Sequence, residues 1–371
     1  MRLLLVADQL RGHAPDGIST YIRGLVGGLD ALPSPPHVTL WASRPPPSQA
    51  VHDPVAALGH DTLTSLLPRK ALVWAWDRGW ISPWSAAPDG FDVIHATSLA
   101  VPPRGSAPLA VTVHDLVWRR VPEAFPARGR RWHEAALGRA IARAAALVAP
   151  SRQTADDLLA AGAPARRVTV VEEGCDHLPP PDRDGAAALL KSLGVDGDFL
   201  LTVSTLEPRK NLTRLIAAYQ AARPRLSEPW PLLVVGPAGW GPRLSPQPGV
   251  VLAGPVEGAV LAGLYARARV VASVPLVEGF GLPAVEAMAC GAAVVASPVP
   301  STGDAAYTVD PTDTSAITEA LARVATDDTL RRDLLAAGRA RAAQLTWAAA
   351  AARHVEVWAS LSASAGHRGR R

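Results

Sequence analysis

Two glutamates in a glycine-rich segment, Glu278 and Glu286, have side chains whose chemistry and spacing could bind a ligand. They lie in PLVEGFGLPAVEAMACG, residues 275–291, the first in a predicted loop and the second one turn into a predicted helix. Ionised carboxylates accept hydrogen bonds and donate none, so the pair suits vicinal hydroxyls better than a phosphate. The segment therefore predicts a polyol site. The alternative is a structural turn with one solvent-exposed and one capping glutamate.

The residue types around the two glutamates predict a strand, a loop and a helix. An apolar strand ends near Val274, and glycines at 279 and 281 let the loop backbone approach a ligand closely. Pro283 suits the first turn of a helix, and Gly291 is a typical helix stop. Because the free N–H groups of a helix N-terminus attract anions and polar hydroxyls, we expect this N-terminus to point at the ligand.

A second segment has the same order of elements and carries cations. Residues 199–211, FLLTVSTLEPRKN, predict a strand and a loop, with Arg209 and Lys210 just before a helix over 212–222. Asn211 is expected to cap that helix. Lys210 is one of only three lysines in the chain. Cations beside a helix N-terminus form an anion site that fits a pyrophosphate. The alternative is a solvated basic loop.

Short apolar runs alternate with helical stretches along the whole chain, which predicts an α/β fold. Continuous apolar strands are typical of parallel sheets covered on both faces. The expected strands of the first half are 2–7, 37–41, 92–96, 109–113, 146–149 and 168–171, and those of the second half are 199–204, 232–236, 250–253, 270–274, 292–297 and 307–309. Six strands per half indicate two doubly wound domains, and the prolines at 179–181 indicate the break between them.

Composition and charge exclude several classes of protein. With 48% hydrophobic and 19% charged residues, the 371-residue chain has the composition of a folded protein. A net charge of +4 is low for a dedicated nucleic-acid binder. Cys175 and Cys290 lie far apart without metal-ligand spacing, which indicates a reduced, cytoplasmic chain. The N-terminal apolar run is too short for a signal peptide, and no run of about 20 apolar residues predicts a membrane span.

Two motifs imitate sites of other enzyme classes. Asp182–Asp184 and Asp196–Asp198 have the D-x-D spacing of a metal site, but they lie in the predicted hinge and in a turn. No metal is therefore expected. GPAGWG, residues 236–241, follows a strand and imitates a dinucleotide fingerprint, but prolines at 237 and 242 crowd the turn. A nicotinamide dehydrogenase would also leave the two glutamates unexplained.

Clustered tryptophans and a basic helix face are further candidates for contacts. The clustered tryptophans are Trp74, Trp76, Trp80 and Trp84. They are expected to pack a helix onto the sheet, with stacking on an acceptor sugar as the alternative. At about 100° per residue, four arginines fall within an arc of about 120°: Arg128, Arg131, Arg139 and Arg143. This face is either solvated or a peripheral contact with a membrane or lipid phosphate.

Together these motifs resemble the retaining glycosyltransferases of family 4, which have the GT-B fold. The resemblance rests on the E-x7-E pair in EGFGLPAVEAMACG, on the EPRKN loop, and on DGISTYIRGL, FDVIHATS, VTVHDL and LVAPSRQTADDL in the first half. VVGPAGWG is similar to a branch with many mannosyltransferases of surface polysaccharide assembly. The resemblance implies two Rossmann-like domains facing across a cleft, 1–178 for the acceptor and 179–346 for the donor. A helix over 347–361 is expected to pack on the first domain, and 362–371 to form a disordered tail.

The resemblance also implies roles for particular residues. Glu278 matches the glutamate that contacts the donor sugar, and Glu286 matches the one that binds the ribose. Arg209 and Lys210 match the pyrophosphate-binding cations, and His114 matches a histidine near the reacting sugar. The expected catalytic residues are therefore Glu278, His114 and Lys210. The expected donor site also includes Gly17, Thr205, Arg209, Val256, Gly279, Phe280, Gly281, Leu282 and Glu286.

The implied activity is transfer of a hexose, with retention of anomeric configuration, from a nucleotide diphosphate donor. GDP-mannose is the first expectation and a UDP-sugar the second. The acceptor is a glycan, a lipid-linked or a small molecule, and neither a metal nor another cofactor is expected. The protein is expected in the cytoplasm, with the inner face of the membrane as the alternative. Two rival interpretations remain: a nucleotide-sugar epimerase of the same fold, and a non-catalytic sugar-binding relative.

Three positions depart from the family's usual pattern. Ser204-Thr205 stand where many members have Gly-Arg, although the mannosyltransferase-like branch often shows Gly-Thr. The glycine loop is Gly17-Ile-Ser19, where Gly-Gly-x-Gly is more usual. Residues 297–304 are shorter than the family's corresponding stretch, which often carries Pro-Glu-Val.

Overall fold

The chain forms two compact units. The computed structural model describes residues 1–12, 16–49, 51–80, 87–103, 105–241 and 246–368. The first unit contains Met1–Leu116, Pro126–His177 and the C-terminal segment from Trp347, and the second contains Val117–Phe125 and Leu178–Thr346. The main break thus lies one residue before the predicted boundary at 178. The short segment Val117–Phe125 groups with the second unit, although the sequence analysis assigns it to the first.

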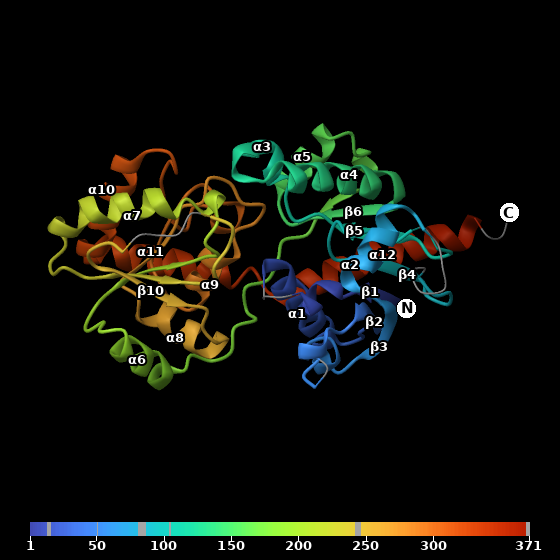
Figure 1. Cartoon of the computed structure of the whole chain (residues 1–371), viewed down its shortest axis with the longest axis horizontal. Coiled ribbons are helices and arrows are strands. Elements are labelled where there is room, and N and C mark those ends of the chain that lie inside the picture. The colour runs from blue at the N-terminus through green and yellow to red at the C-terminus, as the bar shows by residue number, and fades with distance from the viewer. Residues whose placement is uncertain (13–15, 50, 81–86, 104, 242–245, 369–371) are drawn as a thin grey trace. The chain divides into compact units, whose positions relative to one another are not determined.

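The first unit is built on a seven-stranded parallel sheet in the order β3-β2-β1-β4-β5-β6-β7 (Figure 1). The strands are β1 (Arg2–Val6), β2 (His37–Arg44), β3 (Asp61–Pro68), β4 (Val93–Ala96), β5 (Leu109–Thr112), β6 (Ala146–Ala149) and β7 (Val168–Val170). The helices are α1 (Gly17–Asp30), α2 (Arg69–Asp77), α4 (Ala127–Arg143), α5 (Arg152–Ala160) and α12 (Trp347–Arg368). Strand order centred on β1 is that of a doubly wound sheet.

Strand β3 is not among the strands that the sequence predicts. It pairs with β2 at the edge of the sheet, and most of its residues are exposed or half-buried. Leu63 is 38% exposed and Leu66 is 66% exposed. Because the prediction looked for continuous apolar runs, it found strands buried on both faces and passed over this partly solvated edge.

The second unit has a six-stranded parallel sheet in the order β10-β9-β8-β11-β12-β13. The strands are β8 (Leu200–Val203), β9 (Leu232–Val235), β10 (Val250–Gly254), β11 (Val270–Ser273), β12 (Val294–Ala296) and β13 (Tyr307–Thr308). The helices are α3 (Val117–Arg120), α6 (Arg183–Ser192), α7 (Leu212–Ala222), α8 (Gly258–Arg267), α9 (Leu282–Ala289), α10 (Thr314–Thr326) and α11 (Asp328–Ala342). Helices α7 and α10 lie on one side of this sheet, and α6 and α8 lie on the other (Figure 1). All six strands predicted for this half are present.

The C-terminal helix α12 packs on α1 in the first unit. Trp347 and Trp358 are buried in the core of that unit. Glycines in α1 make this packing possible: a Cβ at Gly24 would lie 2.0 Å from the Trp347 ring, and one at Gly28 would lie 2.2 Å from its main-chain oxygen. The helix continues to Arg368, where the sequence analysis expects a disordered tail, because serines and alanines follow position 361 without a proline. Residues 369–371 lie outside the described part.

A buried chain of hydrogen bonds joins α12 to the sheet. Trp358 donates to Nδ1 of His95 at 2.9 Å, and Nε2 of His95 lies 2.8 Å from the Thr112 hydroxyl. That hydroxyl lies 2.8 Å from the hydroxyl of Tyr21, which lies 2.8 Å from Nε2 of His354. The indole N–H of Trp358 can only donate, so Nδ1 of His95 accepts and Nε2 of His95 donates. The hydrogen bonds of the series then all run from Trp358 toward His354, and both histidines are neutral.

Two of the four arginines on the basic face of α4 make contacts within the first unit. Arg139 donates to Asp77 at 2.5 Å, and Arg143 donates to two main-chain oxygens at 3.1 Å. Arg128 and Arg131 are exposed. Arg139 and Arg143 therefore make contacts within the first unit, which helical spacing does not reveal. A membrane or lipid-phosphate contact of this face stays a prediction. Within the described residues, no helix is both long and apolar enough to cross a bilayer.

The clustered tryptophans have different environments. Trp76 is fully buried and packs against Trp41, with ring centroids 5.0 Å apart. Trp74 and Trp80 are about half exposed and pack edge to face against each other. The expected packing role thus belongs to Trp76, while Trp84 lies outside the described residues.

Candidate functional site

The two segments singled out in the sequence meet at the carboxyl-terminal ends of the strands of the second sheet. Strands β8 and β11 are parallel neighbours, so the loops that follow them leave the sheet on the same side. The main-chain N–H of Leu276 donates to the carbonyl of Arg209 at 2.8 Å and joins the two loops directly. Open α/β sheets bind ligands at this carboxyl-terminal end of their strands.

Four charged side chains form a cluster between these loops. Lys210 donates to Oε1 of Glu278 at 2.5 Å, and Arg209 donates to Oε2 of Glu278 at 2.9 Å. The other terminal nitrogen of Arg209 lies 2.9 Å from Oε1 of Glu207. All four side chains are largely buried, with exposed fractions of 18% or less. The structure therefore brings the predicted sugar-binding acid and the predicted phosphate-binding cations into direct contact.

The two glutamates of this cluster differ in their electrostatics. Burial alone would raise the pKa of Glu278, but the charges of Arg209 and Lys210 outweigh burial and lower it to about 2. For Glu207, burial dominates and raises the pKa, even though Arg209 and Lys210 oppose it. Glu278 is thus held firmly as a carboxylate, whereas the charged form of Glu207 is the less favourable one.

Asn211 does not cap α7 as predicted. Its backbone adopts a left-handed conformation, with φ of 61°, and its side chain makes no capping hydrogen bond. Instead its amide donates to the carbonyls of Val274 at 3.0 Å and Pro311 at 2.7 Å. Because positive φ turns the side chain away from the helix amides, Asn211 ties the cation loop to the end of β11.

The glycine loop before α9 is held by the shortened segment 297–304. Gly281 has a φ of +100°, and a Cβ there would lie 3.0 Å from Val299 and 3.1 Å from Oγ of Ser301. Ser301 donates through Oγ to the Gly281 carbonyl at 2.9 Å and through its main-chain N–H to that of Phe280 at 3.0 Å. Ser301 is fully buried. The sequence pattern did not predict this support, and its signal is the position of Ser301 in the segment after β12.

Glu286 lies on α9 in a buried, polar environment. It is 8% exposed, and the hydroxyl of Tyr265 donates to its Oε2 at 3.2 Å. Burial and the nearby Glu286 charge raise the pKa of Cys290 to about 11, so the thiol is protonated. A carboxylate that a tyrosine hydroxyl orients can accept hydrogen bonds from a diol.

The remaining predicted donor-site residues of the second unit also come after the carboxyl-terminal ends of its strands. Thr205 comes just after β8, and its carbonyl accepts the main-chain N–H of Glu207 at 2.9 Å. Val256 lies half-buried between β10 and α8. The side chains of Phe280 and Leu282 are buried, so only their backbone and that of neighbouring Gly279 could meet a ligand.

The glycines of the GPAGWG segment serve the packing of one loop on another. A Cβ at Gly236 would lie 2.1 Å from the carbonyl oxygen of Ser204, and one at Gly239 would lie 2.5 Å from that of Leu206. Gly241 donates its N–H to the same Leu206 carbonyl at 3.0 Å. Close approach of the two backbones therefore explains the spacing without a dinucleotide.

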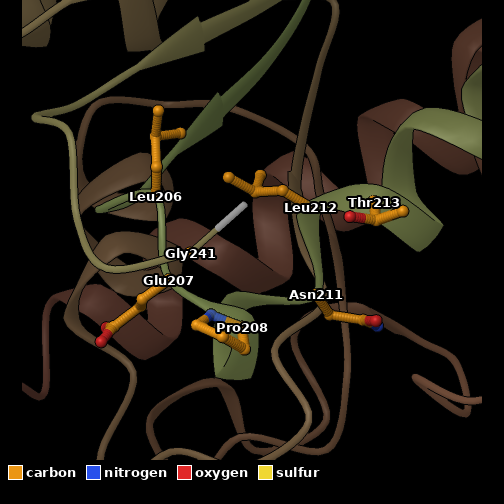
Figure 2. Close-up of a pocket in the computed structure, with 7 residues that line it drawn as sticks. All are labelled: Leu206, Glu207, Pro208, Asn211, Leu212, Thr213 and Gly241. Carbon is orange, nitrogen blue, oxygen red and sulfur yellow. The ribbon is translucent and has the colours of Figure 1, made fainter. Parts of the chain in front are cut away.

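A small cavity of about 160 Å³ lies at the turn after β8. It is lined by Leu206, Glu207, Pro208, Asn211, Leu212, Thr213 and Gly241 (Figure 2). Figure 2 shows the Leu212 side chain directed toward Gly241, whereas the Glu207 carboxylate and the Asn211 amide leave the turn on opposite sides. Of the four residues of the charged cluster, only Glu207 lines this cavity.

His114 follows β5 in the first unit and is held by two acceptors. Its Nδ1 lies 3.2 Å from Oε1 of Glu173, and its Nε2 lies 2.9 Å from the carbonyl of Thr97. Burial opposes protonation, but the hydrogen bond and charge of Glu173 outweigh it and raise the pKa of His114. A carboxylate and a main-chain carbonyl thus face the two ring nitrogens, and both favour the protonated ring. Glu173 was missed in the sequence, where the signal was an acidic pair directly after β7.

Gly17 begins α1, also in the first unit. The preceding Asp16 caps the helix, its side chain accepting the N–H of Ser19 at 2.8 Å. A Cβ at Gly17 would meet no described atom within 4 Å, so its surroundings do not require glycine. Residues 13–15, just before it, lie outside the described part.

The D-x-D motifs hold no metal-binding arrangement. Asp182 caps α6 by accepting the N–H of Gly185 at 2.8 Å. Among the described residues, no group of three or more histidine, cysteine, aspartate or glutamate side chains could hold a metal ion.

Two family models match the chain. The one described as Glycosyltransferase Family 4 matches residues 15–177, and the one described as Glycosyl transferases group 1 matches residues 197–327. These ranges fall within the first and second structural units apart from the short segment 117–125.

Curated relatives include a mannosyltransferase and an inositol phosphate glycosyltransferase. The chain is 31% identical to O-antigen chain mannosyltransferase B of Escherichia coli over 253 residues, which cover 64% of this chain and 66% of the relative. It is 34% identical to D-inositol 3-phosphate glycosyltransferase of Xylanimonas cellulosilytica over 247 residues, which cover 60% and 58%. The matches thus span about two thirds or less of these relatives' lengths.

Solved structures of similar fold cover nearly the whole chain. HepE of Anabaena, in complex with UDP and glucose, has a TM-score of 0.71 at 19% identity and covers 97% of this chain and 100% of its own. Sucrose-phosphate synthase from Thermosynechococcus elongatus has a TM-score of 0.74 at 20% identity and covers 98% and 99%. At such identities the likeness concerns the fold.

Proposed function

Because the chain belongs to glycosyltransferase family 4 and has the GT-B fold, we propose that it transfers a hexose from a nucleotide diphosphate donor with retention of configuration. The observation that carries this proposal is the contact of Glu278 with Arg209 and Lys210, in the loops that follow the neighbouring strands β8 and β11. Two cations that could bind a diphosphate thus contact an acid that could bind sugar hydroxyls. Glu286 lies on α9, the helix that follows this acid.

The chemistry that we propose needs positioning and charge neutralisation rather than a protein base. The acceptor oxygen attacks the anomeric carbon on the face that the diphosphate leaves. The bond to the diphosphate breaks, and the acceptor proton passes to a phosphate oxygen. Arg209 and Lys210 would neutralise the departing diphosphate, and Glu278 would stabilise the positive charge that develops on the sugar.

GDP-mannose is the donor that we propose first. Its support is the similarity to O-antigen chain mannosyltransferase B over 64% of the chain. A UDP-sugar is the second candidate, because the similar structure of HepE contains UDP and glucose. We propose a glycan, lipid-linked or small-molecule acceptor and no metal cofactor.

The test mixes the purified chain with GDP-mannose or UDP-glucose, with and without candidate glycan, lipid-linked and inositol phosphate acceptors. Release of nucleoside diphosphate that depends on the acceptor, with a product of the donor's anomeric configuration by NMR, would support the proposal. An inverted product would contradict retention. Isomerised sugar without an acceptor would indicate an epimerase, and donor binding without any reaction would indicate a non-catalytic relative.

A further inference from the structure

We propose that Glu207 takes up a proton from solvent when a nucleotide sugar binds, and releases it when the nucleoside diphosphate leaves. In this role Glu207 is a positioning residue: it holds Arg209 in place before binding and becomes neutral when Arg209 turns to the phosphates. The inference rests on the proposed function, since it assumes that a diphosphate occupies the cation pair.

The contacts of Glu207 are unusually few for a buried acid. Its side chain is 3% exposed, and its Oε1 lies 2.9 Å from a terminal nitrogen of Arg209. Among the described residues, its Oε2 has no hydrogen-bond partner. An unpaired carboxylate oxygen removed from water is destabilising, so this oxygen is a natural position for a proton.

The charges of the cluster already balance without a ligand. Two carboxylates, Glu207 and Glu278, face two cations, Arg209 and Lys210, and the four formal charges sum to zero. A nucleotide sugar adds two negative phosphodiester charges. Binding therefore leaves the site with excess negative charge, which the uptake of one proton would reduce.

Of the two carboxylates, Glu207 is the one that is protonated more readily. Glu278 has a cation on each oxygen, and these hold its pKa at about 2. Glu207 has one such partner and shares it with Glu278. The charged groups that act on Glu207 are Arg209, Lys210 and Glu278, and burial together with Glu278 already raises its pKa. Once Arg209 also serves the phosphates, the pKa of Glu207 rises further.

Isothermal titration calorimetry in buffers of different ionisation enthalpy measures the proton directly. GDP-mannose and UDP-glucose are the probes, because phosphodiesters do not titrate at acid to neutral pH. We expect uptake of up to one proton per site. The affinity should then rise as pH falls, by at most about tenfold per pH unit, in the window between the pKa values of Glu207 in the free and bound protein.

Glu207→Gln preserves shape and removes the titrating group. This variant should bind without proton uptake and with an affinity independent of pH over that window. The matched control is Glu228→Gln, an exposed glutamate of the same unit, which should keep the full uptake. Binding by the unaltered protein without proton uptake would overturn the inference, as would undiminished uptake in Glu207→Gln. If neither sugar nucleotide binds the unaltered protein, the proposed function fails and the inference with it.

Discussion

Lys210 and Arg209 both contact Glu278, but only Lys210 reaches it as a flexible point charge. Lys210→Ala should lower kcat/KM by about 10- to 100-fold, because one charge-assisted contact to the leaving diphosphate is lost. Steady-state kinetics with GDP-mannose, the donor proposed first, would measure the loss. Lys191→Ala, on the exposed face of α6, is the control and should leave the rate unchanged. An unchanged rate in Lys210→Ala, with the variant folded by circular dichroism, would exclude this residue from the site.

The two glutamates of the E-x7-E pair should affect different kinetic constants. Glu286 is assigned to a part of the donor that does not react, so Glu286→Gln should mainly raise KM. Glu278 is assigned to the sugar that gains positive charge, so Glu278→Gln should mainly lower kcat. Steady-state kinetics of the two variants would separate these effects.

Affinity for the bare nucleoside diphosphate gives an independent measure of the same assignment. Glu286→Gln should weaken this affinity. Glu278→Gln should preserve or strengthen it, because the carboxylate that pairs with Arg209 and Lys210 is removed. Loss of diphosphate binding in Glu278→Gln with none in Glu286→Gln would reverse the roles assigned here.

At the scale of elements, the loop before α9 depends on a glycine that has two separate requirements. Gly281 has positive φ, and a Cβ there would lie only 3.0 Å from Val299 and 3.1 Å from Oγ of Ser301, so these neighbours would have to shift. Gly162 has a similar φ of +90°, but a Cβ there would meet no described atom within 4 Å. Gly281→Ala should therefore cost more stability than Gly162→Ala, which carries only the strain of about 1–2 kcal/mol. Urea unfolding measures both.

The same pair of variants tests whether the loop serves the donor. Gly281→Ala should raise KM for the donor, since the shifted loop carries the backbone next to Glu278. Gly162→Ala should leave the kinetics unchanged. Equal effects of the two substitutions on stability and on KM would show that Ser301 and Val299 do not constrain the loop.

The hydrogen-bonded chain that anchors α12 should make the first unit sensitive to acid. Burial lowers the pKa of His95 and His354, the latter to about 4 against an ordinary value of 6.5. The unfolded chain then binds protons that the folded chain does not. Stability from these histidines is full above pH 6.5 and falls below it, by up to about 1.4 kcal/mol per pH unit for each. His114 acts in the opposite direction, because its raised pKa stabilises the fold at low pH and that contribution is lost as pH rises.

Thr112→Val would interrupt this chain while preserving its shape. The substitution leaves the N–H of His95 without its acceptor and removes one partner of Tyr21. We expect a loss of about 1–3 kcal/mol in unfolding free energy, measured by urea denaturation. Thr169→Val, in the half-buried edge strand β7, is the control and should change stability by less than about 0.5 kcal/mol. Equal effects would show that the chain contributes no more than an ordinary threonine.

At the scale of the whole molecule, we expect turnover to survive excess EDTA. The described residues contain no cluster of metal ligands, whereas Arg209 and Lys210 supply positive charge where the diphosphate is proposed to bind. Nucleotide release measured with and without the chelator tests this expectation. Activity that disappears with EDTA and returns with Mg²⁺ or Mn²⁺ would refute it.

The division into two units also rests on pairings across long stretches of sequence. The helix that begins at Trp347 follows the second unit in the chain but is built into the core of the first. Its place depends on room made by two glycines of α1, more than 300 residues earlier. Deleting this helix would therefore remove Trp347 and Trp358 from the core of the first unit.

The sequence by itself determined the order of the elements and the residues worth examining. All twelve predicted strands are present, and the loops carrying Glu278 and Lys210 follow the strands expected of them. This works because apolar runs, glycines and prolines act on the backbone locally. Strand β3 escaped because its partly exposed edge position has no continuous apolar run.

The tertiary structure alone decided which side chain meets which. The order of strands places β8 beside β11, and only then does Arg209 contact Glu278, 69 residues away. The same contacts leave one oxygen of Glu207 without a hydrogen-bond partner in the described part of the chain. They also make Asn211, the predicted helix cap, bond to the carbonyl of Val274 instead. Periodicity encodes whether a residue is buried, but partners depend on how strands that are distant in sequence pair. The chemistry of the site therefore arises from sheet order, which no local pattern contains.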